Sequence, residues 1–109
     1  MTINNWLDGL TAIVRSDLPD MTNRQMAILL TVAMTAGPHT VRGLATRLDV
    51  SKPVVTRALN KLAALGYLLR KRDRNDGRNI FVEMTKAGTE FLDQFNQTVG
   101  DATIRADAA

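Results

Sequence analysis

The chain has no cysteine and few residues suited to catalysis, and these shortages exclude whole classes of function. Its 109 residues include no cysteine, one histidine, one tryptophan and one tyrosine. Without cysteine there is no disulfide, thiolate metal site or thiol redox switch. His39 has no carboxylate or hydroxyl partner at a catalytic spacing, and the 7 glycines form no phosphate-binding pattern. We therefore expect neither an enzyme active site nor a metal or cofactor.

Long hydrophobic runs are also missing. No apolar run approaches the ~18 residues that indicate a membrane span. The N-terminal residues lack the basic and apolar regions of a secretory signal. We expect a soluble cytoplasmic protein with no membrane partner, folded as a single domain over residues 1–109.

Positive charge is concentrated in the middle of the chain. The net charge is only +3, from 14 Lys and Arg against 11 Asp and Glu. The stretch Thr40–Lys86 holds 11 of those cations and 4 of those acids, so the two ends are mildly acidic. A basic stretch of this kind attracts polyanions, and nucleic acid is the commonest of them.

The N-terminal part of the chain predicts two helices. Apolar residues recur at helical spacing through residues 1–17. Thr22 and Gln25 then have the spacing of a capping box, which starts a second helix. We expect this helix to run to Gly37, a C′ glycine followed directly by Pro38. Apolar residues lie on nearly all of its sides, so it should be the buried centre of the domain.

Residues 40–66 have the pattern of a helix-turn-helix. Thr40 can cap a short helix over Val41–Leu48. After a turn, Ser51 can cap a further helix, residues 52–65, which is expected to stop at Gly66. Pro53 is harmless in its first turn, because no helical hydrogen bond needs the missing amide proton there.

The hydrophobic period changes to that of strands after this helix. Residues 67–72 and 79–84 are typical of two short strands, with an Asn-Asp-Gly turn signal between them. Thr85 can cap a last helix over residues 85–100, and residues 101–109 look like a ragged tail. The expected fold class is therefore mainly α with a small β-hairpin wing, residues 67–84: a winged helix-turn-helix.

The exposed face of the helix at residues 52–65 suits the major groove of DNA. The first side chains of such a recognition helix reach base edges, while the preceding helix crosses the backbone. Arg57 can make a bidentate contact with guanine, and Asn60 could read adenine or bind phosphate. The residues expected to read bases are Lys52, Pro53, Val54 and Arg57. Those expected at phosphates are Thr40, Ser51, Thr56, Asn60 and Lys61.

The hairpin is crowded with arginine, which inserts readily into a narrow minor groove because the potential there is strongly negative. Within residues 70–80, the wing arginines expected to meet DNA are Arg72, Arg74 and Arg78. We interpret Asp76 as an internal brace for the tip, which leaves Arg74 or Arg78 for the groove.

Both basic elements have a plainer interpretation. The helix could present an ordinary solvated face, and the hairpin could be an edge kept soluble by charge. Exposed Pro53 and Val54 beside a basic hairpin favour DNA binding over these alternatives.

Five short runs of sequence carry a family resemblance: Leu44–Leu48, Ser51–Arg57, Leu62–Leu68, Arg72–Arg78 and Met84–Gly88. Together they resemble the MarR family of winged-helix transcriptional regulators. The resemblance covers about residues 20–95, and the Asp-x-Arg formed by Asp76 and Arg78 is its most specific part.

The resemblance implies a homodimer on a pseudo-palindromic operator, usually acting as a repressor. The family's dimer interface uses the first helix together with the last two helices. The family's small-molecule pocket lies between these dimer helices and the DNA-binding lobe. An effector is therefore conceivable, and its identity is open. This chain ends about where the family's final long helix is under way, so dimerisation would rest on its first and last helices. The interface residues expected are Ile3, Trp6, Leu7, Leu10, Phe91, Leu92 and Phe95. The same apolar stripe could equally be core in a monomer.

A second class of function stays open at this point. A winged helix can also serve as a protein-interaction module, with Pro53 and Val54 facing a partner protein, or as a non-specific DNA-binding accessory protein. Steep salt dependence of duplex binding separates DNA binding from protein binding. The operator sequence cannot be deduced from one recognition helix, and repression or activation depends on promoter geometry.

Overall fold

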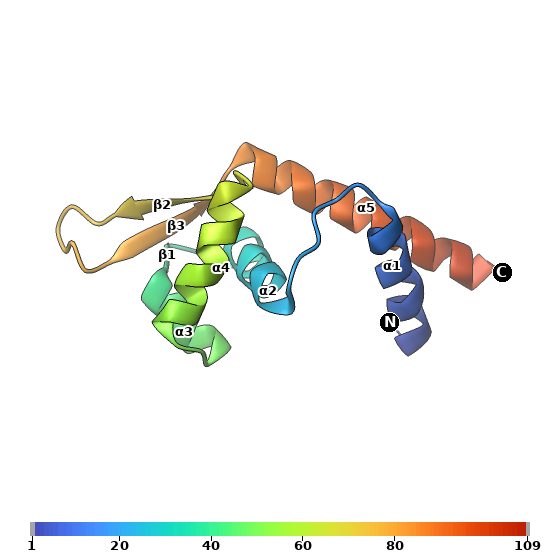
Figure 1. The fold of residues 1–109 in the computed structure, drawn as a ribbon, viewed down its shortest axis with the longest axis horizontal. Helices are drawn as coiled ribbons and strands as arrows, with labels where there is room; N and C mark the ends of the chain where they lie inside the picture. Colours follow the sequence, from blue (N-terminus) through green and yellow to red (C-terminus); the bar gives the residue numbers. More distant parts are fainter. Residues whose placement is uncertain (1, 109) are drawn as a thin grey trace. The chain divides into compact units, whose positions relative to one another are not determined.

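The computed structural model describes residues 2–108, with residues 104–108 as helical backbone only. Its elements are α1 (Ile3–Arg15), α2 (Asn23–Met34), β1 (His39–Thr40), α3 (Val41–Leu48), α4 (Lys52–Ala64), β2 (Leu68–Arg72), β3 (Ile80–Met84) and α5 (Lys86–Ala108) (Figure 1). The described residues form two compact units, residues 2–20 with residues 90–108, and Met21–Thr89. No helix among the described residues is long and apolar enough to cross a membrane.

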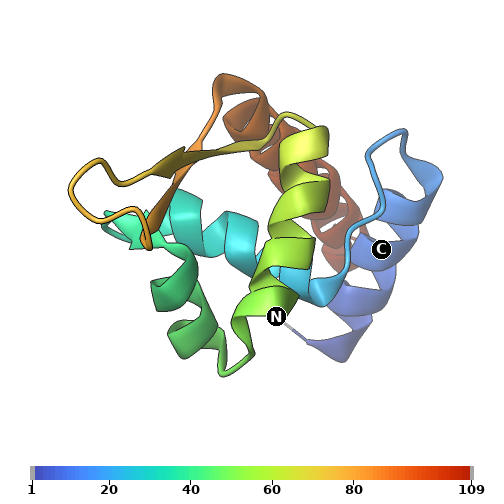
Figure 2. The same ribbon diagram turned by 60° about the vertical axis from the view of Figure 1, so that its left-hand side comes forward.

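The unit of residues 21–89 has its core where α2, α3 and α4 meet. In α4 the buried positions recur at helical spacing, which turns one side of the helix inward. Figure 2 shows α4 lying across α2, with α3 beside it. No charged or polar side chain of the described residues is buried. The buried apolar residues of this unit are Ile28, Leu29, Val32, Leu44, Ala45, Val55, Ala58, Leu59, Leu62, Leu68 and Val82.

The three strands form an antiparallel sheet in the order β1-β3-β2. Arg70 pairs with Val82, and Leu69 pairs with Glu83. Side chains alternate along a strand, so Arg70 lies on the same sheet face as buried Leu68, and Lys71 lies on the other. The loop between β2 and β3 extends beyond the helices of this unit (Figure 1). Strand β1 was not predicted, because two residues carry no readable alternation.

Local signals placed most of these elements correctly. Thr22, Thr40 and Ser51 are the N-caps of α2, α3 and α4, as predicted. The fold class is also confirmed: it is mainly α with a small antiparallel wing.

The predicted end of α2 is wrong. The helix ends at Met34, and Thr35 already has extended backbone angles. Gly37 is not a left-handed cap, and its peptide bond to Pro38 is cis. Residues 39–40 must be extended to pair with β3, and a proline disfavours helix in the residue before it, so the helix stops early. Nor is α2 buried all round, because Met34 is 76% exposed.

The predicted end of the last helix is also wrong. Helix α5 continues through Gly100 to Ala108, where a tail was expected. One glycine costs a helix only about 1 kcal/mol relative to alanine. Residues 101–108 include three alanines, and alanine is the best helix former, so they favour continuation of the helix.

Hydrogen bonds join the beginning of α5 to the end of α4 at the base of the hairpin. Gly66 closes α4 with a φ of 81°, a left-handed angle that favours glycine. The Thr85 hydroxyl donates to the Gly66 carbonyl and accepts from the Gly88 amide, which caps α5. The Thr85 amide donates to the Tyr67 carbonyl at 3.1 Å. A Cβ on Gly88 would lie 2.2 Å from that carbonyl oxygen, so the junction requires glycine.

We predict that Gly88→Ala lowers the free energy of unfolding by about 1–3 kcal/mol, because the backbone of Tyr67 would have to move. Urea denaturation measures this change. The matched control is Gly100→Ala in the same helix, where a Cβ would meet nothing within 4 Å. That variant should be neutral or gain up to about 1 kcal/mol. Equal stability of the two variants would contradict the close approach at Gly88.

Candidate nucleic-acid interface

The outer side of α4 carries the residues expected to read bases. Lys52, Pro53 and Arg57 are exposed, and Val54 is half-buried. Thr56, Asn60 and Lys61 are exposed on the same helix. The inner side is Val55, Ala58, Leu59 and Leu62, all buried.

The cations of α4 are free to meet an anion. Within the part of the chain that the structure describes, the side chains of Lys52, Arg57 and Lys61 form no hydrogen bond or ion pair. The sequence has no Asp or Glu between Asp49 and Asp73 to neutralise them. This side of the helix therefore presents unpaired positive charge.

The N-cap hydroxyls of α3 and α4 can bind phosphate without giving up their caps. Thr40 accepts a hydrogen bond from the Gly43 amide at 3.0 Å, and Ser51 accepts one from the Val54 amide at 3.4 Å. A hydroxyl has one donor and two acceptor lone pairs, so capping leaves the O–H free to donate. Neither helix has an acidic residue in its first turn, so nothing there opposes an anion at its positive end.

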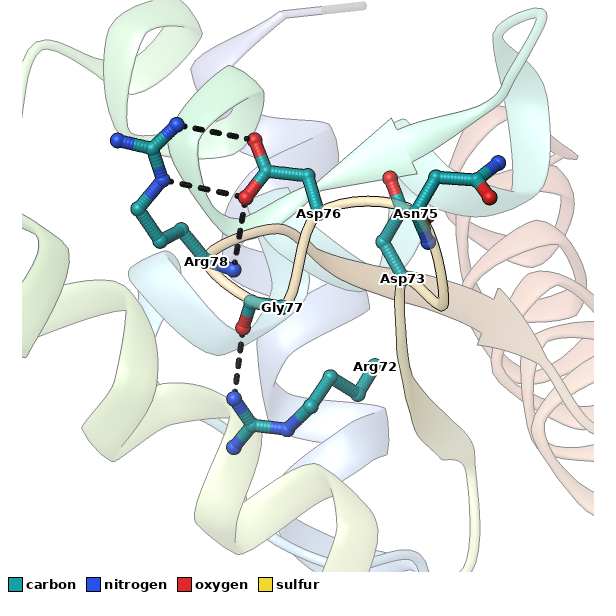
Figure 3. Close-up of polar contacts among 6 residues, drawn as sticks. All are labelled: Arg72, Asp73, Asn75, Asp76, Gly77 and Arg78. Carbon is teal, nitrogen blue, oxygen red and sulfur yellow. Dashed lines mark hydrogen bonds and ion pairs between the residues drawn. The ribbon is translucent and has the colours of Figure 1, made fainter.

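The wing tip is organised around Asp76 and Arg78 (Figure 3). The Arg78 side chain donates from Nε to Asp76 Oδ1 at 3.1 Å and from Nη2 to Oδ2 at 3.4 Å. The Arg78 amide also donates to Oδ1 at 3.1 Å. These side-chain and backbone hydrogen bonds lower the pKa of the Asp76 carboxyl, and the charge of Arg42 lowers it further. Asp76 therefore stays ionised and holds Arg78 in one orientation.

The other two wing arginines differ in what they contact. Arg72 Nη1 donates to the Gly77 carbonyl at 2.6 Å, so its guanidinium connects β2 to the loop at the wing tip (Figure 3). Arg74 has no hydrogen bond or ion pair to any described residue. Of the three, Arg74 is the arginine that the wing leaves without an internal role.

Two further basic residues belong to this surface and were absent from the predicted set. Arg70 donates from Nη1 to Asn60 Oδ1 at 2.8 Å, which joins β2 to α4. Arg42, in the first turn of α3, lies close enough to Asp76 to lower its pKa. Helical or strand periodicity cannot reveal either contact, since both depend on how the chain folds back after Gly66. Their only sequence signal is membership of the basic stretch.

The residues expected at a dimer interface lie on α1 and α5. Ile3, Trp6, Leu7 and Leu10 share one face of α1 and are 55–81% exposed, and Val14 extends that face. On α5, Leu92 and Phe95 are half-buried. Phe91 is only 3% exposed, with its ring centroid 6.1 Å from that of Phe95. Phe91 is thus a core residue of the single chain, with almost no surface to offer a second copy.

The chain is similar to several known proteins. Residues 19–79 match the family model of the MarR family. The uncharacterized HTH-type transcriptional regulator YkoM of Bacillus subtilis (strain 168) is 32% identical over 66 residues, which are 61% of this chain and 43% of YkoM. The chain therefore spans less than half the length of this relative.

Solved structures of other proteins are also similar to this chain. Transcriptional regulator Tm0710 from Thermotoga maritima has a TM-score of 0.73 and 26% identity, covering 98% of this chain and 74% of that chain. A mutant MarR from E. coli, complexed with operator DNA, has a TM-score of 0.67 and 29% identity. That match covers 80% of this chain and 61% of the MarR chain.

We predict that Arg78→Ala raises the pKa of Asp76 back toward the ordinary value of an aspartate, because it removes the side-chain hydrogen bonds that favour the ionised form. An acid titration followed by NMR of the Asp76 side-chain carboxyl carbon measures this pKa. A lowered carboxyl pKa means that the pairing is present at neutral pH and is lost as the pH falls through that lowered pKa.

Arg74→Ala is the matched control, because it removes one arginine from the same tip without breaking a bond to Asp76. The Asp76 midpoint should move little in this variant. An equal upward shift in both variants would mean that the total charge of the wing, and not the contact with Arg78, sets the pKa.

Proposed function

This chain belongs to the MarR family, and we propose that it is a sequence-specific transcriptional repressor that binds operator DNA as a homodimer. The observation that carries the proposal is α4, whose inner side is buried while its outer side presents unpaired Lys52, Arg57 and Lys61. The likeness to a MarR structure complexed with operator DNA supports it.

In this proposal the first turns of α4 enter the major groove. Arg57 would donate two guanidinium N–H groups, one to O6 and one to N7 of the same guanine, the commonest specific contact in such complexes. Lys52 lies at the start of the helix, within reach of a guanine or a phosphate, and Pro53 offers apolar surface to a thymine methyl. The hydroxyls of Thr40 and Ser51 would donate to phosphates on either side and fix the register.

The wing would meet the adjacent minor groove. Arg74 is the best candidate to insert, because no described group holds its guanidinium. Arg78, held by Asp76, would present its remaining donors to the sugar-phosphate backbone from a fixed position. Arg72 would serve the same surface indirectly by holding the Gly77 carbonyl.

A second copy of the chain would cover the apolar face of α1. Ile3, Trp6, Leu7 and Leu10 lie more than half exposed along one face, which is unusual for an isolated chain in water. Burying one leucine side chain contributes about 1.5–3 kcal/mol. Two α4 helices related by a two-fold axis would then read half-sites about one helical turn apart.

We predict that Arg57→Ala relaxes base preference at one position of each half-site, at a cost of about 1–3 kcal/mol. Selection of bound sequences from a random duplex pool, followed by competition between duplexes that differ at one base pair, measures this. Lys61→Ala is the control, since loss of a phosphate contact should weaken all duplexes alike and leave the preferred sequence unchanged.

The salt dependence of duplex binding by the wild-type chain decides between DNA binding and protein binding. Its affinity for duplex DNA should fall steeply with salt, with a slope of about −0.9 per phosphate neutralised. An affinity that is negligible, or that does not change with salt, would refute DNA binding and favour a protein-interaction module.

We further predict that Leu7→Glu shifts the chain from dimer to monomer, because it places a charge at the centre of the apolar face of α1. Sedimentation equilibrium over a concentration series measures the dissociation constant. Asn4→Glu adds the same charge at an exposed polar position of the same helix and should leave dimerisation nearly unchanged. A wild-type chain that stays monomeric at micromolar concentration, or a Leu7→Glu variant that still dimerises, would contradict this interface.

A further inference from the structure

One hydrogen bond on the proposed DNA-binding surface joins side chains from the recognition helix and the wing. Arg70 of β2 donates from Nη1 to Oδ1 of Asn60 of α4 at 2.8 Å, and both residues are exposed. Arg70 reaches Asn60 because it shares a sheet face with buried Leu68, and β2 packs against α4 on that side. No acidic side chain takes part in this contact.

The chemistry of the pair leaves a set of groups that only donate hydrogen bonds. A guanidinium has five N–H donors and no acceptor, so only the Asn60 oxygen can be its partner. The Asn60 amide is therefore fixed with its acceptor toward Arg70 and its two N–H donors directed elsewhere. Four N–H donors of Arg70 also remain unused within the described residues. Such a cationic, donor-only cluster matches an anionic oxygen.

We propose that Arg70 and Asn60 form a two-residue clamp for one backbone phosphate of the operator, bridging the recognition helix and the wing. The inference rests on the proposed function, because it assigns the ligand of one part of that surface. Asn60 lies on the outer side of α4, three residues beyond Arg57 and away from the N-terminal turn that reaches the bases. A phosphate at the groove edge would lie beside it.

The same contact argues against adenine as the partner of Asn60. Bidentate recognition of adenine needs the amide oxygen to accept from N6 while the amide nitrogen donates to N7. Arg70 already donates to one of the two lone pairs of that oxygen, and its positive charge would face the partly positive N6 amino group. Phosphate requires donors alone, so the clamp selects the DNA backbone over a base edge.

Arg70→Ala tests the clamp by fluorescence anisotropy on the operator and on mismatched duplexes across a salt series. We expect affinity to fall about tenfold on every duplex, with a salt slope smaller by about 1 and an unchanged base preference. Lys71→Ala is the matched control, because it removes the same charge from the next residue, on the opposite sheet face, where Lys71 pairs with Glu83 at 3.0 Å. It should lose much less affinity. Thermal melts of all variants check that folding is intact.

Asn60→Ala and the double variant separate the clamp from two independent contacts. Because the residues act together, the double variant should lose less affinity than the product of the two single losses. Full additivity would overturn the clamp, and so would equal effects of Arg70→Ala and Lys71→Ala. A relaxed adenine preference in Asn60→Ala would assign that residue to base reading instead.

A titration with inorganic phosphate at constant ionic strength identifies the source of the anion. If the clamp serves DNA alone, phosphate should displace DNA equally from the wild type and from Arg70→Ala. Displacement from the wild type alone would show that the pair holds a free anion, which overturns the assignment to the DNA backbone. Absence of any duplex binding by the wild type would instead refute the proposed function itself.

Discussion

Burial of one side of α4 is the constraint on which the rest of the structure depends. Val55 and Leu62 are 0% exposed, seven residues apart, so together they fix the rotation of the helix about its axis. A rotation by one residue, about 100°, would bring Thr56 or a neighbouring polar side chain into the core, where an unpaired polar group costs at least 1 kcal/mol. The outward direction of Lys52, Arg57 and Asn60 is therefore set by apolar packing on the other side. In this way the core decides which side chains a ligand can reach.

The hairpin depends on the same helix through a short polar junction. Gly66 ends α4 with a left-handed angle, and Thr85 then joins Gly66, Tyr67 and Gly88 by three hydrogen bonds. Both strands begin or end within two residues of this point, so the direction of the wing follows from the direction of α4. The contact between Asn60 and Arg70 adds a second tie at mid-helix. Two ties along one edge restrict the wing more than a single hinge would, which suits the proposed function, in which α4 and the wing would fit two grooves at once.

Features set by residues close together in the chain could be predicted from the sequence. Features set by contacts between distant parts of the chain could not. N-caps at Thr22, Thr40 and Ser51 were readable, because a capping residue and its partner lie within three positions. The early end of α2 was not, because it follows from the pairing of residues 39–40 with β3, about forty residues later. Within the site, the exposed side of α4 came from periodicity alone. The roles of Arg72, on the Gly77 carbonyl, and of Arg70, on Asn60, could not be separated from those of other arginines, since residue type does not distinguish a cation that holds the protein from one that is free.

The difference between held and free arginines also bears on why the exposed side chains of α4 and the wing bond to other groups of the protein. The Arg78 side chain is 84% exposed and that of its partner Asp76 is 38% exposed, and solvent screening leaves such a pair little effect on stability. Stability is therefore a weak reason for the pairing. Binding is a stronger one, because immobilising a flexible side chain at an interface costs about 0.5–1.5 kcal/mol. Arg70, Arg72 and Arg78 have incurred much of that cost before any ligand arrives, whereas Arg74 has not. In the proposed complex the held arginines would favour affinity through a fixed shape, and Arg74 would adjust to the local width of a groove.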